Sequence, residues 1–281
     1  MIKIEMYSSQ ELFWPQPQLG IQFMKTSIEG KTVWITGAGS GIGRAAVNSL
    51  VQAGARVALS GRRVNPLEET LEMVQSINGN GIIVPVDVAD SEAVLAAADE
   101  IRAELNQIDI LINSAGINLP KRRYGEMKIG DWQRVIDTNL NGAYNCIYAV
   151  LPEMRDRGAG LIINVSSWAG RHDSYVAGPA YGASKHAVSS MSATINLEEG
   201  RHGIRCCSLE PAEVATEILD QRPIPVSDEE RARMLQPDDL GETIRFIAEM
   251  PAHVCLNEVL ISPTWNRFHL GGPGWYPEPP S

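Results

Sequence analysis

Short apolar runs alternate along the chain with longer stretches in which apolar residues recur at helical spacing. The run 31–36 (KTVWIT) is rich in β-branched residues and ends in glycines, and the helical pattern that follows it stops at Gly54. Repeated to residue 262, this alternation predicts strands at 31–36, 55–60, 81–88, 108–116, 161–166, 204–209 and 258–262. It predicts helices at 42–53, 66–77, 91–106, 131–157, 181–199 and 238–249, the third of them capped by Ser91.

Alternating strands and helices are typical of parallel sheets with right-handed crossovers. The predicted strands are almost continuously apolar, as expected when helices cover both faces of the sheet. We therefore expect an α/β protein with one domain, built on a doubly wound parallel sheet of about seven strands. Its parts are an N-terminal extension (1–30), a catalytic domain (31–265) and a Gly/Pro-rich tail (266–281), which is either free or anchored over a pocket by Trp275 or Tyr276.

Composition excludes several classes of protein. The chain has 281 residues, 44% of them apolar and 21% charged, which is enough for a large core. A formal net charge of −10 argues against a partner nucleic acid, which needs a basic surface. The four cysteines have no metal-binding spacing, so we expect reduced thiols and no metal site. Without an apolar run of membrane-spanning length or a signal-like N-terminus, the expected location is cytoplasmic.

Glycines follow the first strand and precede the first helix, in the segment 36–43 (TGAGSGIG). Glycines let a backbone turn sharply and approach a ligand, and the helix N-terminus offers free N–H groups to a pyrophosphate. In this context the segment predicts a dinucleotide site of the Rossmann type. Its expected cofactor contacts are Gly37, Ser40, Gly41, Ile42 and Gly43.

Tyr181 and Lys185 stand four residues apart at the start of a predicted helix, so both project from one face. An ammonium group near a phenol lowers the phenol's pKa, and such a tyrosine can exchange a proton with a carbonyl or alcohol oxygen. Taken alone, the pair is also a common surface feature. Ser166 and Ser167 end the preceding strand, and Asn139 interrupts the long predicted helix, where asparagine is a poor helix former.

The order of these motifs resembles the short-chain dehydrogenase/reductase family, whose glycine motif is T-G-x-x-x-G-x-G. The resemblance covers about residues 30–262 and implies a catalytic tetrad of Asn139, Ser167, Tyr181 and Lys185. In this family the tyrosine is the general acid/base, the serine binds the substrate oxygen, and the lysine also binds the nicotinamide ribose. Further cofactor contacts implied by the resemblance are Asp87, Val88, Asn113, Ala115, Gly116, Pro211, Val214 and Thr216, together with Tyr181 and Lys185 themselves.

The end of the second strand indicates which cofactor is used. NAD-preferring enzymes carry a carboxylate there for the ribose 2′-hydroxyl, whereas this chain has Gly61 followed by Arg62 and Arg63. Two guanidinium groups favour a 2′-phosphate. We therefore expect NADP, with NAD as the alternative. The segment from Gln236 to Thr264 also resembles NADP-dependent short-chain hydroxy-acid dehydrogenases.

Three departures from the family pattern affect the pocket. Ser114 replaces the second Asn of N-N-A-G, Ala212 replaces Gly in Pro-Gly, and the Ser–Tyr separation is one residue longer than the commonest form. The pocket walls are expected from 117–124, 168–180 and 212–237, with Trp168, Tyr175, Val214, Ile218 and Leu219 as apolar lining. Arg171 and His172 are candidates for contact with an anionic substrate, although loop residues of these types are more often solvated.

The resulting expectation is a hydride-transferring oxidoreductase that acts on a small carbonyl or alcohol substrate. A catalytically silent nucleotide-binding scaffold, or a lyase or isomerase with bound cofactor, remains as an alternative. The resemblance further implies a homotetramer or homodimer joined through the helices near 131–157 and 181–199.

Overall fold

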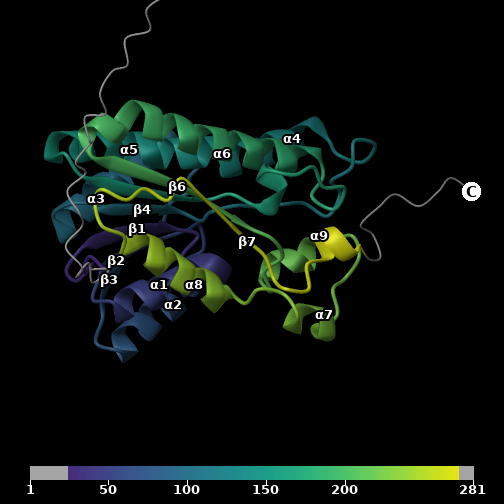
Figure 1. Ribbon diagram of the computed structural model, residues 1–281, viewed down its shortest axis with the longest axis horizontal. Coiled ribbons are helices and arrows are strands. Elements are labelled where there is room, and N and C mark those ends of the chain that lie inside the picture. The colour runs from purple at the N-terminus through teal and green to yellow at the C-terminus, as the bar shows by residue number, and fades with distance from the viewer. Residues whose placement is uncertain (1–24, 272–281) are drawn as a thin grey trace, which may run out of the picture.

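The computed structural model describes residues 25–271, which form a seven-stranded parallel sheet with helices on both faces (Figure 1). The strand order is β3-β2-β1-β4-β5-β6-β7. Their bounds are β1 Thr32–Thr36, β2 Arg56–Ser60, β3 Asn80–Ile83, β4 Ile110–Asn113, β5 Gly160–Val165, β6 Ile204–Pro211 and β7 Glu258–Ile261. The predicted doubly wound fold is confirmed.

Two apolar cores lie on opposite faces of this sheet. Helices α1 (Gly41–Gln52), α2 (Val64–Ser76) and α8 (Pro237–Ala248) cover one core, and α3 (Ser91–Leu105), α5 (Gly142–Arg157) and α6 (Pro179–Glu199) cover the other. The adjacent residues Cys206 and Cys207 belong to different cores, because successive side chains of a strand point to opposite faces. Both thiols are buried, as predicted, and burial raises the pKa of Cys207 to about 12.

The third strand and the helix after it differ from the prediction. β3 ends at Ile83, although Val84 and Val86 still donate backbone hydrogen bonds to Leu59 and Gly61. The cap of α3 is Asp90 and not Ser91. The Asp90 carboxylate accepts hydrogen bonds from two backbone N–H groups of the first turn, 3.1 Å each, and an acid at a helix N-terminus also complements the helix dipole.

The long helix predicted at 131–157 is interrupted. It consists of α4 (Ile129–Ile136), a π-helical turn at Asp137–Asn141, and α5. A π-turn inserts one extra residue into the helical ladder and frees local backbone groups, which is why such turns occur at functional sites. Asn139 lies in this turn, which explains how a poor helix former is accommodated.

The two ends of the chain are described only in part. Residues 1–24 of the predicted extension and 272–281 of the predicted tail, including Trp275 and Tyr276, lie outside the described residues. Ile28 packs into the core, and the Thr26 N–H donates to the Glu249 carbonyl at 2.8 Å. Near the other end, α7 (Asp228–Ala232) and α9 (Arg267–Leu270) lie beside the carboxyl ends of the strands (Figure 1). No helix within 25–271 is long and apolar enough to cross a membrane.

Candidate active site

A cavity of about 590 Å³ opens at the carboxyl ends of the strands. This is where ligands bind in open α/β sheets, at the point where strand order reverses between β1 and β4. The predicted site residues that line it come from the ends of the central strands, the loops after them, and the N-terminal turns of α1 and α6: Gly37, Ser40, Gly41, Ile42, Arg62, Ala115, Gly116, Ser167, Tyr181, Lys185, Pro211, Val214 and Thr216. The structure therefore brings the glycine loop and the Ser–Tyr–Lys group into one space.

The glycine loop is packed too tightly for side chains at its key positions. A Cβ atom on Gly37, whose φ is +67°, would lie 2.9 Å from the Ala115 nitrogen, and one on Gly43 would lie 2.2 Å from the Gly37 carbonyl oxygen. Gly41 has φ +49°, and a Cβ atom there would lie 3.1 Å from the Thr216 Cγ2. Ser40 is the N-cap of α1 without a side-chain cap bond. The loop thus presents backbone and a helix N-terminus to the cavity, as a pyrophosphate site requires.

Asn139 lies outside the cavity lining and supports the loop that forms one wall. Its side chain accepts from the Ile117 N–H at 2.8 Å and donates to the Ile117 carbonyl at 3.0 Å, and it also donates to the Ser184 hydroxyl at 3.1 Å. These bonds tie the π-turn to the loop after β4 and to α6. A Cβ atom on Gly116 would lie 3.5 Å from the Lys185 Nζ and 3.6 Å from the Asn139 Oδ1, so these two groups flank one glycine.

The structure separates the two candidate serines. The buried Ser166 hydroxyl is hydrogen-bonded to the Lys185 carbonyl and to the Ser189 hydroxyl, 2.9 Å in both cases, which is a bond pattern of structural support. Ser167 begins the 3-10 turn Trp168–Gly170, accepts from the Ala169 N–H at 3.1 Å, and hydrogen-bonds with the Tyr181 phenol. Ser167 is thus the serine beside the tyrosine.

Burial and nearby charges act in opposite directions on Tyr181. Desolvation raises the pKa of the Tyr181 phenol, whereas the Ser167 hydrogen bond and the positive charges of Arg122 and Arg222 lower it. Lys185 Nζ donates to the Val165 carbonyl at 2.7 Å and lies 5.7 Å from the centre of the Tyr181 ring. Burial outweighs these charges, so the pKa of Tyr181 lies above its ordinary value, and the two guanidinium groups supply positive charge that favours the phenolate.

Lys185 is itself destabilised as an ammonium ion. Burial lowers the pKa of its side chain to about 8, because a buried cation loses its hydration. A strongly shifted pKa beside a cavity is characteristic of a functional site.

Some predicted contacts lie outside the cavity lining. The Asn113 amide donates to Asn164 at 2.9 Å below the cavity, and the Val88 side chain packs in the core beside Gly142. Arg63 is the N-cap residue of α2. Asp87 stands outside the lining with a carboxylate oxygen 4.0 Å from the Arg62 guanidinium. Ala212 has no positive φ, and its N–H donates to the Ile261 carbonyl at 2.8 Å, so the replaced glycine leaves no backbone strain.

The candidate residues for anion contact and two aromatic residues are placed differently from the prediction. Arg171 is paired with Glu258 at 2.5 Å, and His172 packs on Trp168 with ring centres 4.9 Å apart. Trp168 packs on Phe268, and Tyr175 is covered by the Arg123 guanidinium, 3.5 Å above its ring. Phe268 lines the cavity, whereas the predicted residues Arg171, His172, Trp168 and Tyr175 do not.

Arginines that the sequence analysis did not single out also line the cavity, among them Arg122, Arg134 and Arg222. Arg122 comes from the predicted wall 117–124 and Arg222 from the predicted wall 212–237, so the segments were recognised but the residues were not. Arginine in a loop is ordinarily solvated, and no local signal marked these two as buried.

The residues present fit a nicotinamide dinucleotide. The tight glycine loop provides the pyrophosphate cradle, and the cavity extends from that loop to Tyr181 and Lys185. No group of three or more His, Cys, Asp or Glu side chains within 25–271 is arranged to bind a metal ion.

Comparison with known proteins agrees with this geometry. The family model for short chain dehydrogenases matches residues 31–224. The chain is 35% identical over 250 residues to a sulfoacetaldehyde reductase of Chromohalobacter salexigens, covering 85% of this chain and 97% of that one. It is 32% identical over 244 residues, or 85% of its length, to the glycine betaine reductase ATRR of Emericella nidulans, but it spans only 19% of that longer protein.

Solved structures give the same result. The closed form of a serine dehydrogenase complexed with NADP+ matches with a TM-score of 0.74 at 31% identity, over 83% of this chain and 94% of that chain. A short-chain dehydrogenase from Mycobacterium paratuberculosis bound to NAD matches with a TM-score of 0.74 at 25% identity, over 84% of this chain and 97% of that chain. The chain therefore belongs to the short-chain dehydrogenase/reductase family and is an NAD(P)-dependent oxidoreductase.

Proposed function

We propose that the protein is an NADP(H)-dependent carbonyl reductase or secondary-alcohol dehydrogenase in which Tyr181 is the general acid/base. The observation that carries this proposal is the single cavity shared by Ser167, Tyr181, Lys185 and the glycine loop. The names of relatives point the same way, since they include a reductase of sulfoacetaldehyde and a dehydrogenase of serine.

Each of the cavity residues has a separate role in the proposed proton transfer. When bound, the nicotinamide cofactor supplies or accepts the hydride. The Tyr181 hydroxyl donates its proton to a carbonyl oxygen, or takes one from an alcohol, while the Ser167 hydroxyl hydrogen-bonds the same oxygen. The positive charges near Tyr181 stabilise the phenolate that forms after donation. Lys185 faces the ribose position beside Gly116, and Asn139 holds the loop at Ile117 in place.

The preference for NADP follows from Arg62. This exposed side chain lines the cavity at the end of β2, where a 2′-phosphate of the adenosine ribose would lie. Gly61 beside it carries no carboxylate that would repel the phosphate. The Asp87 carboxylate lies 4.0 Å from the Arg62 guanidinium group, and a dianionic phosphate would compete with it for that group.

Replacing the phenol tests the proposed acid/base. Tyr181→Phe should lower kcat by at least ~100-fold on a panel of aldehydes and ketones, because the proton donor is lost. The affinity for NADPH, measured by fluorescence titration, should stay unchanged. Tyr175→Phe is the matched control, since that ring lies outside the cavity lining. A Tyr181→Phe enzyme that retains more than half of its activity would refute the assignment.

A further inference from the structure

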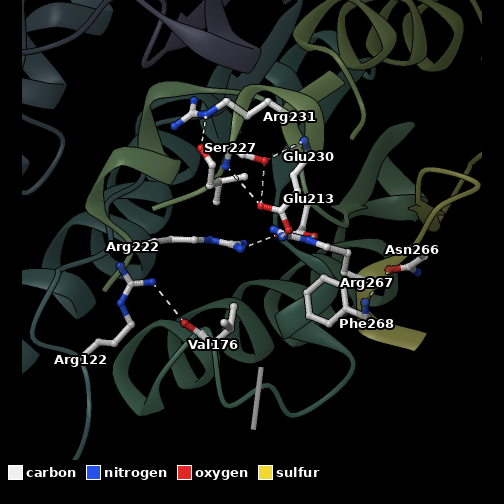
Figure 2. Close-up of polar contacts among 11 residues, drawn as sticks. Arg122, Val176, Glu213, Arg222, Ser227, Glu230, Arg231, Asn266, Arg267 and Phe268 are labelled. Atoms are coloured by element: carbon white, nitrogen blue, oxygen red, sulfur yellow. Dashed lines mark hydrogen bonds and ion pairs between the residues drawn. The ribbon is translucent and has the colours of Figure 1, made fainter. Parts of the chain in front are cut away.

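Arg122 is a buried cation at the meeting point of three cavity walls. The residue is 3% exposed, and its guanidinium group donates to the carbonyls of Leu119 at 2.6 Å, Val176 at 3.2 Å and Gln221. Each carbonyl belongs to a different wall of the pocket. These three acceptors are neutral carbonyl groups, so the hydrogen bonds fix the position of the guanidinium without balancing its charge; Figure 2 shows the bond to Val176.

The fold makes room for this arginine at a specific place. Gly178 has φ +76°, and a Cβ atom there would lie 2.5 Å from the Arg122 carbonyl oxygen and 3.1 Å from its Cγ. Only glycine allows the loop before α6 to pass so close to the arginine. An arginine has five N–H donors, and three are used by the carbonyls above. One N–H on each terminal nitrogen therefore remains, so the guanidinium group can still donate charge-assisted hydrogen bonds to an anion.

A second guanidinium group stands nearby on the same cavity. Arg222 has a side chain that is 12% exposed, and it is paired with Glu213 at 2.5 Å. Glu213 also accepts two hydrogen bonds from Arg267, both 2.7 Å, and Arg267 is paired in turn with Glu230 (Figure 2). These interactions hold Arg222 firmly in the wall formed after β6.

Arg122 gives this end of the cavity an unbalanced positive charge, since Glu213 and Glu230 offset the charges of Arg222 and Arg267. Burial is the main reason that the pKa of Arg122 falls to about 10, and the charge of Arg222 adds to the effect. Arg122 and Arg222 line the same cavity as Tyr181, and both charges lower the pKa of its phenol. A buried cation is costly unless an anion pairs with it, and in this cavity a substrate can supply that anion.

We propose that the substrate carries an anionic group, a carboxylate or a sulfonate, which Arg122 binds while Tyr181 exchanges a proton with the carbonyl or alcohol oxygen elsewhere in the same molecule. This inference rests on the proposed function and names its substrate class. Neutral aldehydes lack the charge-assisted hydrogen bonds, and aldehydes that carry a quaternary ammonium are repelled.

Kinetics with matched probes test the charge preference. Succinic semialdehyde and its methyl ester differ by one charge, 3-sulfopropanal offers a sulfonate, and betaine aldehyde offers a cation. We expect wild-type kcat/KM to be ~10- to 100-fold higher for the two anions than for the ester, and lowest for the cation. Comparing the carboxylate with the sulfonate identifies which anion fits. A wild type that prefers the ester or betaine aldehyde would overturn the proposal.

Variants of Arg122 distinguish binding from structural support. Arg122→Gln keeps hydrogen-bond donors but removes the charge, so it should lower kcat/KM for the anions by ~10- to 100-fold and for the ester by less than 3-fold. Equal losses on all probes would show that Arg122 only holds the loops together. Arg122→Lys keeps the charge and should retain part of the preference. Arg123→Gln is the matched control, because this neighbour covers Tyr175 and lies outside the cavity lining.

A binding measurement separates this inference from the proposed function. Calorimetric titration of the full chain with succinate or 1-propanesulfonate, in the presence of NADP+, should show binding that Arg122→Gln weakens at least ~10-fold and Arg123→Gln does not. This result would stand even if no aldehyde were reduced, in which case the proposed reaction alone fails. If wild type and Arg122→Gln bind both anions equally, the inference fails whatever the activity.

Discussion

Single side chains set the charge at the two ends of the cavity. Arg62 stands at the end of β2 beside the glycine loop, and Arg122 with Arg222 stands at the opposite end beside Tyr181. The first was recognisable because strand-end positions have a known relation to the cofactor ribose. The others acquire their role only from burial. Two predictions at this scale concern Arg62 and Lys185.

The cofactor preference should reverse when the charge after β2 is reversed. Gly61 has room for a side chain, since a Cβ atom there meets only the Leu67 side chain at 3.6 Å. Gly61→Asp combined with Arg62→Ala should change a ~10- to 100-fold preference for NADP into a preference for NAD, because a carboxylate repels the 2′-phosphate and accepts from the 2′-hydroxyl. Steady-state kcat/KM with both cofactors provides the measurement. A wild type that prefers NAD would overturn the cofactor assignment and leave Tyr181 unaffected.

The buried Lys185 should make stability depend on pH in a defined window. Its pKa is about 8 in the folded protein, below the ordinary 10.5, so the unfolded chain holds the proton more tightly. The ammonium therefore opposes folding below about pH 8, and this cost disappears as the pH rises toward 10.5. Relative to Lys185→Met, wild type should gain on the order of 3 kcal/mol in free energy of unfolding between pH 7 and pH 11. Urea unfolding without cofactor measures the free energy of unfolding of both proteins. A difference between wild type and Lys185→Met that stays constant with pH would contradict the prediction.

Element boundaries depend on backbone groups that periodicity does not report. The helix after β3 begins where the Asp90 carboxylate accepts two N–H groups, and the long helix after β4 contains the π-turn that carries Asn139. In both places the hydrophobic pattern predicted a helix, but the local hydrogen bonds determine where it starts or is interrupted.

The cap of α3 gives a prediction with a matched neighbour. Asp90→Ala should lower the free energy of unfolding by about 1 kcal/mol, since two N–H groups lose their acceptor, and should lower Tm by roughly 2–4 °C. Ser91→Ala should change Tm by less than 1 °C, because its hydroxyl is not the cap. Thermal unfolding of both variants is the test. A larger decrease in Tm for Ser91→Ala than for Asp90→Ala would show that Ser91 is the N-cap.

At the scale of the whole molecule, α5 and α6 lie together on one face of the sheet, with α8 on the other (Figure 1). Their outer surfaces expose apolar side chains: Tyr144 and Tyr148 on α5 are 55% and 58% exposed, and Leu197 on α6 is 84% exposed. Such side chains on two adjoining helices are consistent with the expected subunit contact. Since α6 also carries Tyr181, assembly through it would brace the site.

Charge placed on this surface should therefore prevent assembly. We predict that wild type is a tetramer or dimer, and that Tyr148→Arg with Leu197→Arg shifts it to monomer in size-exclusion chromatography with light scattering. Phe246→Arg is the control, because that side chain is 47% exposed on α8, across the sheet. A monomeric wild type, or dissociation caused only by Phe246→Arg, would disprove this interface.

The element order, the glycine loop and the Tyr181–Lys185 pair could be predicted from the sequence alone. These features are local, since apolar periodicity, a glycine turn and an i, i+4 pair depend on residues within a few positions of one another. The separation of Ser166 from Ser167 and the contacts of the loops could be seen only in the folded chain. Tertiary packing buried Arg122 against the Gln221 carbonyl, 99 positions away, turned Arg171 toward Glu258, and packed Trp168 on Phe268. Loops show no hydrophobic periodicity, and their contacts depend on where distant strands end. The positive charge of Arg122 in the cavity therefore depends on long-range contacts that no local sequence pattern reports.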